Sequence, residues 1–298
     1  DPYELLAPEA CAILYRIPIA HIGGGEATFG VLDEQVRHAL TKMAHLHFAS
    51  TWEYGWRIRQ MGEEAWRIYV VGAPGVENIR LKDFMLPQEI REKFDINPEI
   101  PTLLITYHPE TLTGSQELHK QITVLIEALK EFPTYQQVIT YPGTEVGSLS
   151  VIRAWEKYQS GRKNVKIVPS LGSRGYLGVM RFAAAVVGNS SSGIIEAPSF
   201  HIPTVNIGDR QKGRIAAASV INVSGNKDSI ISGLNKALKD EEFRRGLTNV
   251  KNPYDPFDDG DVSGRIVKVL EEIPIDRRLY EKRLDFPSPK EKENYSVQ

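Results

Sequence analysis

The 298-residue chain is poor in features that mark secreted and membrane proteins. Cys11 is its only cysteine, so no internal disulfide can form, and this usage fits a reducing compartment. No stretch approaches 18 consecutive apolar residues, so we expect no membrane-spanning helix and no membrane partner. The first residues do not join a basic region to an apolar run, which predicts no signal peptide. We therefore expect a cytoplasmic protein.

The chain also has little excess charge of either sign. It carries 36 Lys and Arg against 38 Asp and Glu, a formal net charge of -2. Proteins that bind nucleic acid usually carry a basic field, so no nucleic-acid partner is expected. If an anionic ligand binds, local groups must hold it.

Signals for a metal or a nicotinamide are weak as well. His45 and His47 alternate onto one face of a predicted strand, but no third ligand lies nearby in sequence, so we expect no metal site. The glycines Gly23, Gly24 and Gly25 do not match the G-x-G-x-x-G pattern of dinucleotide binders. We expect no cofactor.

Apolar strand-like runs alternate with helical patterns along most of the chain, which predicts an α/β fold with parallel sheets covered by helices on both faces. Before residue 81 the pattern indicates helices at 3–15, 31–43 and 53–61, and strands at 17–22, 45–51 and 67–72. After residue 100 it indicates strands at 102–107, 137–141, 165–169, 183–188, 203–207 and 220–223, with helices between most of them and a last helix at 262–273.

Residues 81–100, with Pro87 and Pro98, break this rhythm and suggest a boundary. The predicted domains are a partial N-terminal Rossmann-like domain (1–82), a connector (83–100), a second Rossmann-like domain (101–273) and a surface tail (274–298). The first has about 80 residues against roughly 150 for a typical domain, so we expect it to be N-terminally incomplete. Two doubly wound domains facing each other would form a cleft, with ligands at the carboxyl ends of the strands.

The strongest local signal is a small polar turn after the apolar run that ends at Val187. It reads Gly188-Asn189-Ser190-Ser191-Ser192-Gly193 and leads into a predicted helix that contains Glu196. Backbone N–H groups at a helix start attract anions, and hydroxyls add donors, so the turn predicts a phosphate site. The alternative is a plain helix cap, for which serine is favoured, although a cap needs only one serine.

A second polar segment, residues 206–214, follows the next strand and carries Arg210, Lys212 and Arg214. An arginine could bind a diphosphate through two parallel hydrogen bonds. A solvated loop is the simpler explanation for the segment alone. Its place after the strand next to the serine-rich turn favours a shared site.

Two carboxylates follow the first predicted strand. Glu26 ends a glycine-rich loop, and Asp33 begins the next helix, four residues before Arg37. Paired carboxylates suit proton transfer and the stabilisation of an oxocarbenium-like sugar. A capping acid and a helix-surface ion pair between Asp33 and Arg37 would explain them equally well.

His108 ends the first strand of the second series, in Thr106-Tyr107-His108-Pro109. In this architecture it would face the cleft and could bind a phosphate oxygen or act as an acid. A strand-end histidine is more often an ordinary loop residue.

Taken together, these segments resemble the hydrolysing UDP-N-acetylglucosamine 2-epimerases, in the branch that starts sialic-acid-type biosynthesis. The resemblance runs almost end to end, and the serine-rich turn and the Gly208-to-Arg214 stretch are its most specific parts. The remaining matching segments are Ile17-Pro18-Ile19-Ala20-His21-Ile22, Gly24-Gly25-Glu26, Asp33-Glu34, Arg37-His38-Ala39, Thr106-Tyr107-His108-Pro109 and Asn252-Pro253-Tyr254.

The resemblance implies a GT-B-like fold and a UDP-amino-sugar substrate, without metal or nicotinamide, in a homo-oligomer (a dimer or a tetramer). UDP would leave by elimination, water would add to the resulting glucal, and the proton would return to the opposite face of carbon 2. The implied UDP-binding residues are Ser190, Ser191, Glu196 and Arg210, with the uridine near Val168. The implied residues around the sugar and its leaving phosphate are Asp1, Glu26, Asp33 and His108.

The chain departs from the family pattern at several positions near the expected cleft. Gly23 stands where the family has His or Glu, and Pro2 where it has Arg. A family loop of the form Pro-Asn-x-Asp-x-Gly has Gly143 and Glu145 at its second and fourth positions. These changes leave open a UDP-2,4-diacetamido-trideoxy sugar as the substrate. A GT-B glycosyltransferase and a UDP-sugar-binding protein without catalysis are the remaining alternatives.

Overall fold

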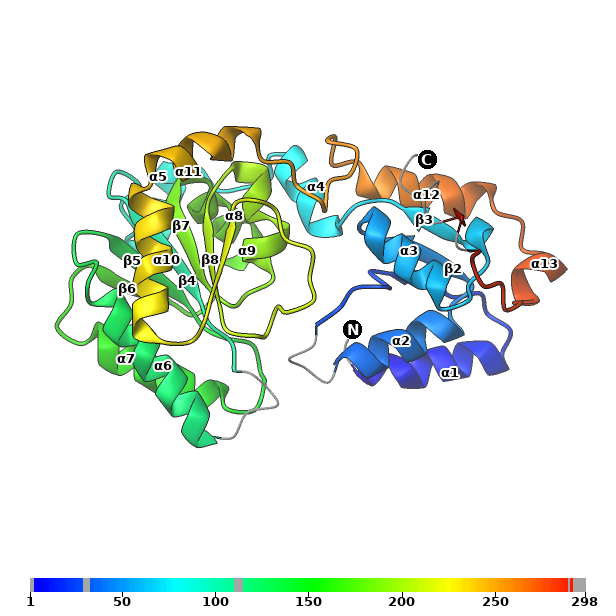
Figure 1. Ribbon diagram of the computed structural model, residues 1–298, viewed down its shortest axis with the longest axis horizontal. Helices are drawn as coiled ribbons and strands as arrows, with labels where there is room; N and C mark the ends of the chain where they lie inside the picture. The colour runs from blue at the N-terminus through cyan, green and yellow to red at the C-terminus, as the bar shows by residue number, and fades with distance from the viewer. Residues whose placement is uncertain (1–2, 29–32, 110–114, 289, 292–298) are drawn as a thin grey trace. The chain divides into compact units, whose positions relative to one another are not determined.

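The computed structural model describes residues 3–28, 33–109, 115–288 and 290–291 (Figure 1). The chain forms two compact units. Unit 1 comprises Asp1–Thr28, Leu32–Arg80 and Pro253–Gln298, and unit 2 comprises Phe29–Val31 and Leu81–Asn252. Each predicted strand overlaps a strand of the structure, so the local patterns identified these elements correctly.

Unit 1 is built on a parallel sheet with the order β1-β2-β3 among its described residues. The strands are β1 (Ala20–Ile22), β2 (Leu46–Ala49) and β3 (Ile68–Val70). The helices before residue 81 are η1 (Tyr3–Leu5), α1 (Leu6–Leu14), α2 (Asp33–Met43), α3 (Trp52–Gln60), η2 (Ala65–Arg67) and α4 (Pro74–Arg80). Thr51 caps α3 by accepting a hydrogen bond from the backbone of Tyr54 at 3.2 Å, which fixes where the chain turns from β2 into the helix.

The C-terminal part of the chain completes unit 1. Helix α12 (Val262–Glu272) lies over β2 and β3 (Figure 1), where Val262 packs against Phe48 and Val71. Helix α13 (Arg277–Tyr280) follows it. We expected residues 253–273 in the second domain, but their apolar stripe is buried against the sheet of unit 1.

Unit 2 is a parallel sheet with the order β6-β5-β4-β7-β8-β9. Its strands are β4 (Thr102–Thr106), β5 (Gln136–Thr140), β6 (Val165–Val168), β7 (Ala183–Gly188), β8 (Thr204–Ile207) and β9 (Val220–Val223). Its helices are α5 (Pro87–Phe94), α6 (Ser115–Leu129), α7 (Ser148–Gln159), α8 (Gly172–Phe182), α9 (Ser192–Ile195), η3 (Ala197–Phe200), α10 (Lys227–Lys239), α11 (Glu241–Gly246) and η4 (Leu247–Asn249).

Helices cover both faces of the unit 2 sheet, and each face has its own apolar core. Helices α6, α7 and α10 gather on one face (Figure 1), where Trp155 and Leu125 are fully buried. Helices α5 and α8 pack on the other, where Ile90 and Ile96 join Leu104 of β4. The segment expected to be a connector, residues 83–100, therefore belongs to unit 2 through these buried side chains.

The strand order decides where a ligand can bind in unit 2. From β4 the chain moves outward to β5 and β6, then returns to place β7 on the other side of β4. Neighbouring connections therefore leave in opposite directions between β4 and β7. We call the carboxyl ends of these two strands the β4–β7 crevice, because sheets of this kind bind their ligands at such a point. Among the described residues, no helix is both long enough and apolar enough to cross a membrane.

Candidate functional site

The carboxyl ends of the unit 2 strands form a level edge. Thr106 at the end of β4 is in register with Thr140 of β5 and with Gly188 of β7. Thr140 in turn pairs with Val168 of β6, and Gly188 pairs with Asn206 of β8. The residues that follow these positions therefore leave the sheet at one height, with the β4–β7 crevice in the middle.

Gly188 ends β7 in a conformation that no other residue could share. Its φ is +130°, and a Cβ atom there would lie 1.9 Å from the backbone oxygen of Thr106. The glycine thus lets the two strands approach closely before the serine-rich turn begins.

Asn189 joins the two sides of the crevice. Its side chain, which is 0% exposed, accepts from the backbone N–H of His108 at 2.7 Å and donates to the His108 carbonyl at 2.8 Å. Its own carbonyl accepts from Arg210 Nη1 at 3.1 Å and from Gln211 Nε2 at 2.8 Å. One asparagine therefore places His108 and Arg210 at the same edge of the sheet.

The serine-rich turn presents its hydroxyls as a hydrogen-bonded group. Ser192 Oγ donates to Ser190 Oγ at 3.0 Å and lies 2.7 Å from the hydroxyl of Tyr176. Burial raises the pKa of Tyr176, so its hydroxyl stays protonated. Ser191 precedes α9 without a side-chain capping bond, whereas Ser190 Oγ accepts from the backbone N–H of Ser192 at 3.4 Å, so one serine of the turn also makes a cap-type contact. The helix itself spans only Ser192–Ile195, so its dipole adds less than the sequence suggested.

His108 lies against an acid from the next loop. Its Nδ1 is 3.1 Å from Oε1 of Glu145, and the same oxygen is 3.6 Å from Nη2 of Arg210. The hydrogen bond from His108 lowers the pKa of Glu145 to about 2, so the carboxylate is ionised at neutral pH. The loop that carries Glu145 also lines a hollow of about 760 Å³, which is formed by residues 142–150 and Ile152 and not by His108 or Arg210.

In unit 1, Glu26 lies at the carboxyl end of the sheet as predicted from its place after β1. Its Oε1 accepts from Ser50, which follows β2, at 3.1 Å. Arg57 of α3 donates to the carbonyl of Gly25 at 2.6 Å, and Arg37 of α2 donates to the carbonyl of Glu26 at 3.3 Å. These contacts hold the loop and its carboxylate in one position.

A family model described as UDP-N-acetylglucosamine 2-epimerase matches residues 1–271. The chain belongs to the UDP-N-acetylglucosamine 2-epimerase family.

Two curated relatives of this family are similar along most of the chain. The polysialic acid biosynthesis protein P7 of Escherichia coli is 36% identical over 255 residues, 85% of this chain and 64% of that protein. The GDP/UDP-N,N'-diacetylbacillosamine 2-epimerase (hydrolyzing) of Campylobacter jejuni is 35% identical over 288 residues, 96% of this chain and 73% of that protein. The chain thus spans about two thirds to three quarters of the length of these relatives.

Solved epimerase structures share the fold. The UDP-GlcNAc 2-epimerase from Neisseria meningitidis, bound to UDP-GlcNAc, aligns with a TM-score of 0.76 at 20% identity, over 89% of this chain and 72% of that one. The predicted class, α/β with two Rossmann-like domains of GT-B type, is confirmed by this likeness and by the two parallel sheets.

The remaining predicted site residues are Glu196, Val168, Asp33 and Asp1. Glu196 follows α9 directly and lies within electrostatic reach of Tyr176. Val168 ends β6, two strands from β4, or about 10 Å at the usual strand spacing. Asp33 begins α2, but its side chain lies outside the described residues, and so do Asp1 and Pro2. Among the described side chains, Glu34 pairs with Arg37 at 3.1 Å.

Three contributors to the site were not predicted. Asn189 and Gln211 lie inside the two motifs but were not given roles, although a polar residue after a buried strand is a usable signal. Ser50 had no sequence signal, because its contact with Glu26 depends on the pairing of β1 with β2.

His47 of β2 and His45, which precedes the strand, serve the structure of unit 1. His47 Nε2 lies 3.0 Å from Oε2 of Glu63, and His45 Nδ1 accepts from the backbone of Ile19 at 3.1 Å. Within the described parts of the chain, no three His, Cys, Asp or Glu side chains form a group that could hold a metal ion.

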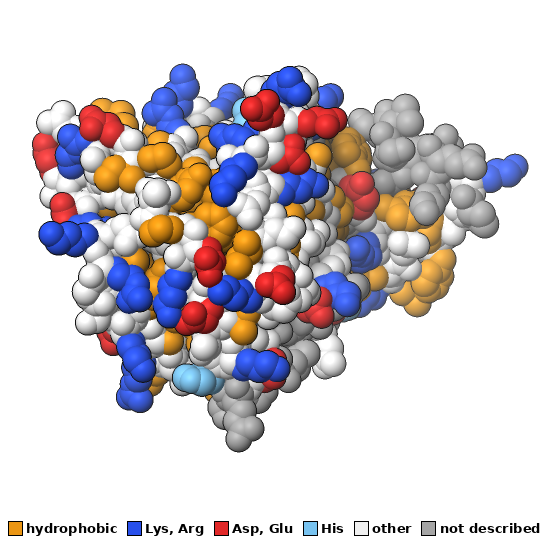
Figure 2. Space-filling model, turned by 60° about the vertical axis from the view of Figure 1, so that its left-hand side comes forward, with side chains coloured by type: hydrophobic (Ala, Val, Ile, Leu, Met, Phe, Trp, Pro, Cys, Tyr) orange, Lys and Arg blue, Asp and Glu red, His pale blue; other side chains and the backbone are white. Residues whose placement is uncertain are grey.

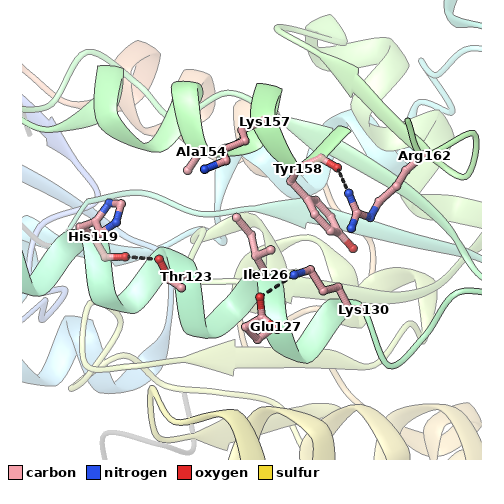
Figure 3. Close-up of a pocket in the computed structure, with 9 residues that line it drawn as sticks. All are labelled: His119, Thr123, Ile126, Glu127, Lys130, Ala154, Lys157, Tyr158 and Arg162. Carbon is pink, nitrogen blue, oxygen red and sulfur yellow. Dashed lines mark hydrogen bonds and ion pairs between the residues drawn. The ribbon is translucent and has the colours of Figure 1, made fainter. Parts of the chain in front are cut away.

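Another hollow of unit 2, about 430 Å³, lies between α6 and α7 (Figure 3). Two of its cations have partners: Lys130 pairs with Glu127 at 2.5 Å, and Arg162 donates to the carbonyl of Tyr158 at 2.8 Å. It is lined by helices, away from the strand ends, and none of the predicted site residues line it. Figure 2 shows a face of the molecule where Lys and Arg are interspersed with Asp and Glu.

Proposed function

We propose that this protein is a hydrolysing UDP-N-acetylglucosamine 2-epimerase that releases UDP and N-acetylmannosamine for sialic-acid-type sugar biosynthesis. The observation that carries the proposal is the grouping of Ser190, Arg210 and His108 around Asn189 at the β4–β7 crevice. Hydroxyls, a guanidinium and an imidazole together match the oxygens of a diphosphate. Family membership supplies the reaction class.

In this proposal unit 2 holds the nucleotide. The diphosphate binds to Ser190, Ser191 and Arg210, and Glu196 binds beside them. Uracil lies near Val168, since the line Thr106–Thr140–Val168 runs from the crevice to β6. His108 is within the same group and stabilises the leaving phosphate.

Unit 1 supplies the carboxylates for the sugar. Removing the proton from carbon 2 needs a base, and breaking the bond at carbon 1 builds positive charge, so carboxylates suit both tasks. Glu26, held by Ser50, is one of them. Asp33 and Asp1 are the others that the family resemblance implies. The route is elimination of UDP, followed by addition of water and return of the proton to the opposite face.

A UDP-2,4-diacetamido-trideoxy sugar is the second candidate substrate. The observation in its favour is the 35% identity to the diacetylbacillosamine epimerase of Campylobacter jejuni, which nearly equals the 36% identity to protein P7. The two candidates differ at carbons 4 and 6 of the sugar, and the reaction at carbons 1 and 2 is the same.

The test is incubation of the protein with each UDP-sugar in D₂O, with assay of free UDP and of the sugar product. The proposal expects UDP release and a product that is inverted at carbon 2 and carries deuterium there. The preferred substrate is the one with the higher kcat/KM. UDP release without inversion would indicate a glycosyltransferase, and binding without UDP release would indicate a UDP-sugar-binding protein.

A further inference from the structure

The loop between β5 and α7 carries two residues that meet at His108. These residues are Gly143 and Glu145. Glu145 folds back so that its Oε1 lies 3.1 Å from His108 Nδ1. The backbone N–H of Gly143 is 3.4 Å from the same nitrogen.

The chemistry of the pair decides which ring nitrogen carries the proton. Glu145 is ionised at neutral pH, because the hydrogen bond from His108 lowers its pKa to about 2. A carboxylate can only accept, so Nδ1 must donate, and it cannot also accept from Gly143 at the longer distance. Nε2 is then the nitrogen that can take up a second proton and donate it in a hydrogen bond to a phosphate oxygen.

The backbone of His108 is already fixed, so the orientation of the ring is what remains to be set. Asn189 binds both the N–H and the carbonyl of His108, at 2.7 and 2.8 Å. The contact to Glu145 then restrains rotation of the imidazole about its side-chain bonds.

Gly143 makes room for this contact. A Cβ atom on Gly143 would lie 2.7 Å from Oε2 of Glu145 and 3.2 and 3.3 Å from two other atoms of the carboxyl group. Its φ lies outside the left-handed region, so space and not backbone conformation requires the glycine. Any side chain there would push the carboxylate off His108.

We infer that Gly143 and Glu145 act together as a positioning device for His108, holding its ring with the Nδ1–H group donated to Glu145. Glu145 is a positioning residue, because it acts through the imidazole. The role of the ring in turnover rests on the function proposed above, whereas the tautomer is a property of the free protein.

The first test is the ¹⁵N spectrum of histidine-labelled protein in alkaline buffer, with the His108 signal assigned from a His108→Gln variant. The wild type should show the Nδ1–H tautomer. Glu145→Gln should shift the signal toward a mixture, because an amide can donate as well as accept. Gly143→Ala should give the same shift, and the double variant should add nothing further, as expected for one coupled device.

Two control variants should leave the His108 signal in place. Glu156→Gln removes a carboxylate of α7 that binds Tyr141, and Gly246→Ala adds a methyl group where no atom lies within 4 Å. An Nε2–H signal in the wild type, or an unchanged signal in both Glu145→Gln and Gly143→Ala, would overturn the inference.

Turnover gives a second readout. Glu145→Gln should lower kcat by about 10- to 10⁴-fold, the range for losing a carboxylate that orients an imidazole, and Glu145→Asp should restore part of it. UDP affinity should hold or rise, because Arg210 loses a competing anion 3.6 Å away. Parallel losses of kcat and UDP affinity would indicate a disordered loop and contradict positioning. A wild type without epimerase activity would refute the proposed function but leave the tautomer result standing.

Discussion

At the scale of single residues, Asn189 contributes more to the site than the serines that made the turn conspicuous. It is fully buried. Its side chain forms hydrogen bonds with the backbone of His108, and its carbonyl accepts hydrogen bonds from Arg210 and Gln211. Three loops that are remote in sequence are therefore positioned by one residue. The serines add hydroxyl groups to this arrangement of hydrogen-bonded loops.

The first prediction concerns Arg210. Its guanidinium lies beside the crevice, and loss of a charge-assisted contact to phosphate costs about 1.5–3 kcal/mol. Arg210→Ala should therefore weaken UDP binding roughly ten- to a hundredfold in calorimetry. Arg245→Ala, an exposed arginine of α11, is the matched control and should bind UDP normally. Unchanged affinity in Arg210→Ala would remove Arg210 from the nucleotide site.

The second prediction concerns Glu26, which the proposal assigns to the sugar and not to UDP. A group that acts only in the transition state lowers turnover without weakening ground-state binding. Glu26→Gln should lower kcat by about 10²–10⁴-fold and keep UDP affinity within a few-fold. Glu53→Gln, an exposed acid of α3, should change neither. Near-normal turnover in Glu26→Gln would return this residue to a structural role in its loop.

At the scale of elements, the C-terminal segment is held to unit 1 by a buried arginine. Arg67 is 0% exposed and donates to the carbonyls of Leu279, Arg278 and Glu281 at 2.9, 2.8 and 3.1 Å. It also pairs with Glu64 at 2.7 Å. The tail, which was predicted to lie on the surface, is anchored to unit 1 by these bonds.

The third prediction follows from this anchor. Arg67→Met leaves several buried carbonyls and the Glu64 carboxylate without their donor, which should cost about 3–5 kcal/mol. Amides of residues 277–286 should then exchange with solvent much faster in hydrogen-exchange experiments. Arg277→Ala removes an exposed pair with Glu281 in the same segment and should alter exchange little. Equal exchange in wild type and Arg67→Met would show that other contacts hold the tail.

At the scale of the whole molecule, buried charge should make stability depend on pH. Burial lowers the pKa of His47 to about 4, against the opposing hydrogen bond to Glu63. Burial alone would raise the pKa of Glu63, but hydrogen bonds from His47, Lys282 and Lys42 outweigh it and bring the value to about 2. Both shifts favour the folded protein at neutral pH.

The fourth prediction is that the free energy of unfolding falls as the pH is lowered from 7 to 5. Unfolded His47 binds its proton near pH 6.5 and folded His47 near pH 4, so its contribution is complete above about 6.5 and is lost as pH falls toward 4. The contribution of Glu63 disappears only below about 4.5. Urea denaturation should therefore show a loss of about 2 kcal/mol between pH 7 and pH 5. His21 and His45, whose pKa values burial also lowers, act in the same direction.

A substitution separates this effect from general acid sensitivity. His47→Gln keeps a donor for Glu63 but cannot titrate, so its stability should fall less between pH 7 and pH 5. His119→Gln, at an exposed position of α6, should keep the wild-type slope. Identical wild-type stability at the two pH values would contradict the prediction.

The sequence alone was enough to predict the strands of this protein and to identify its family. Apolar spacing is a local property, so the runs that became β4, β7 and β8 could be recognised one at a time. Glu26, His108 and Arg210 could be chosen because each follows a strand, and ligands bind where parallel strands end.

The tertiary structure decided which of these elements meet. An amphipathic helix does not specify the sheet that buries it, and α12 packs on unit 1 although it follows unit 2 in sequence. The β4–β7 crevice, the bridge by Asn189 and the contact of Glu145 with His108 join residues 37 to 81 positions apart. Such contacts depend on strand order and long-range packing, which hydrophobic periodicity does not encode.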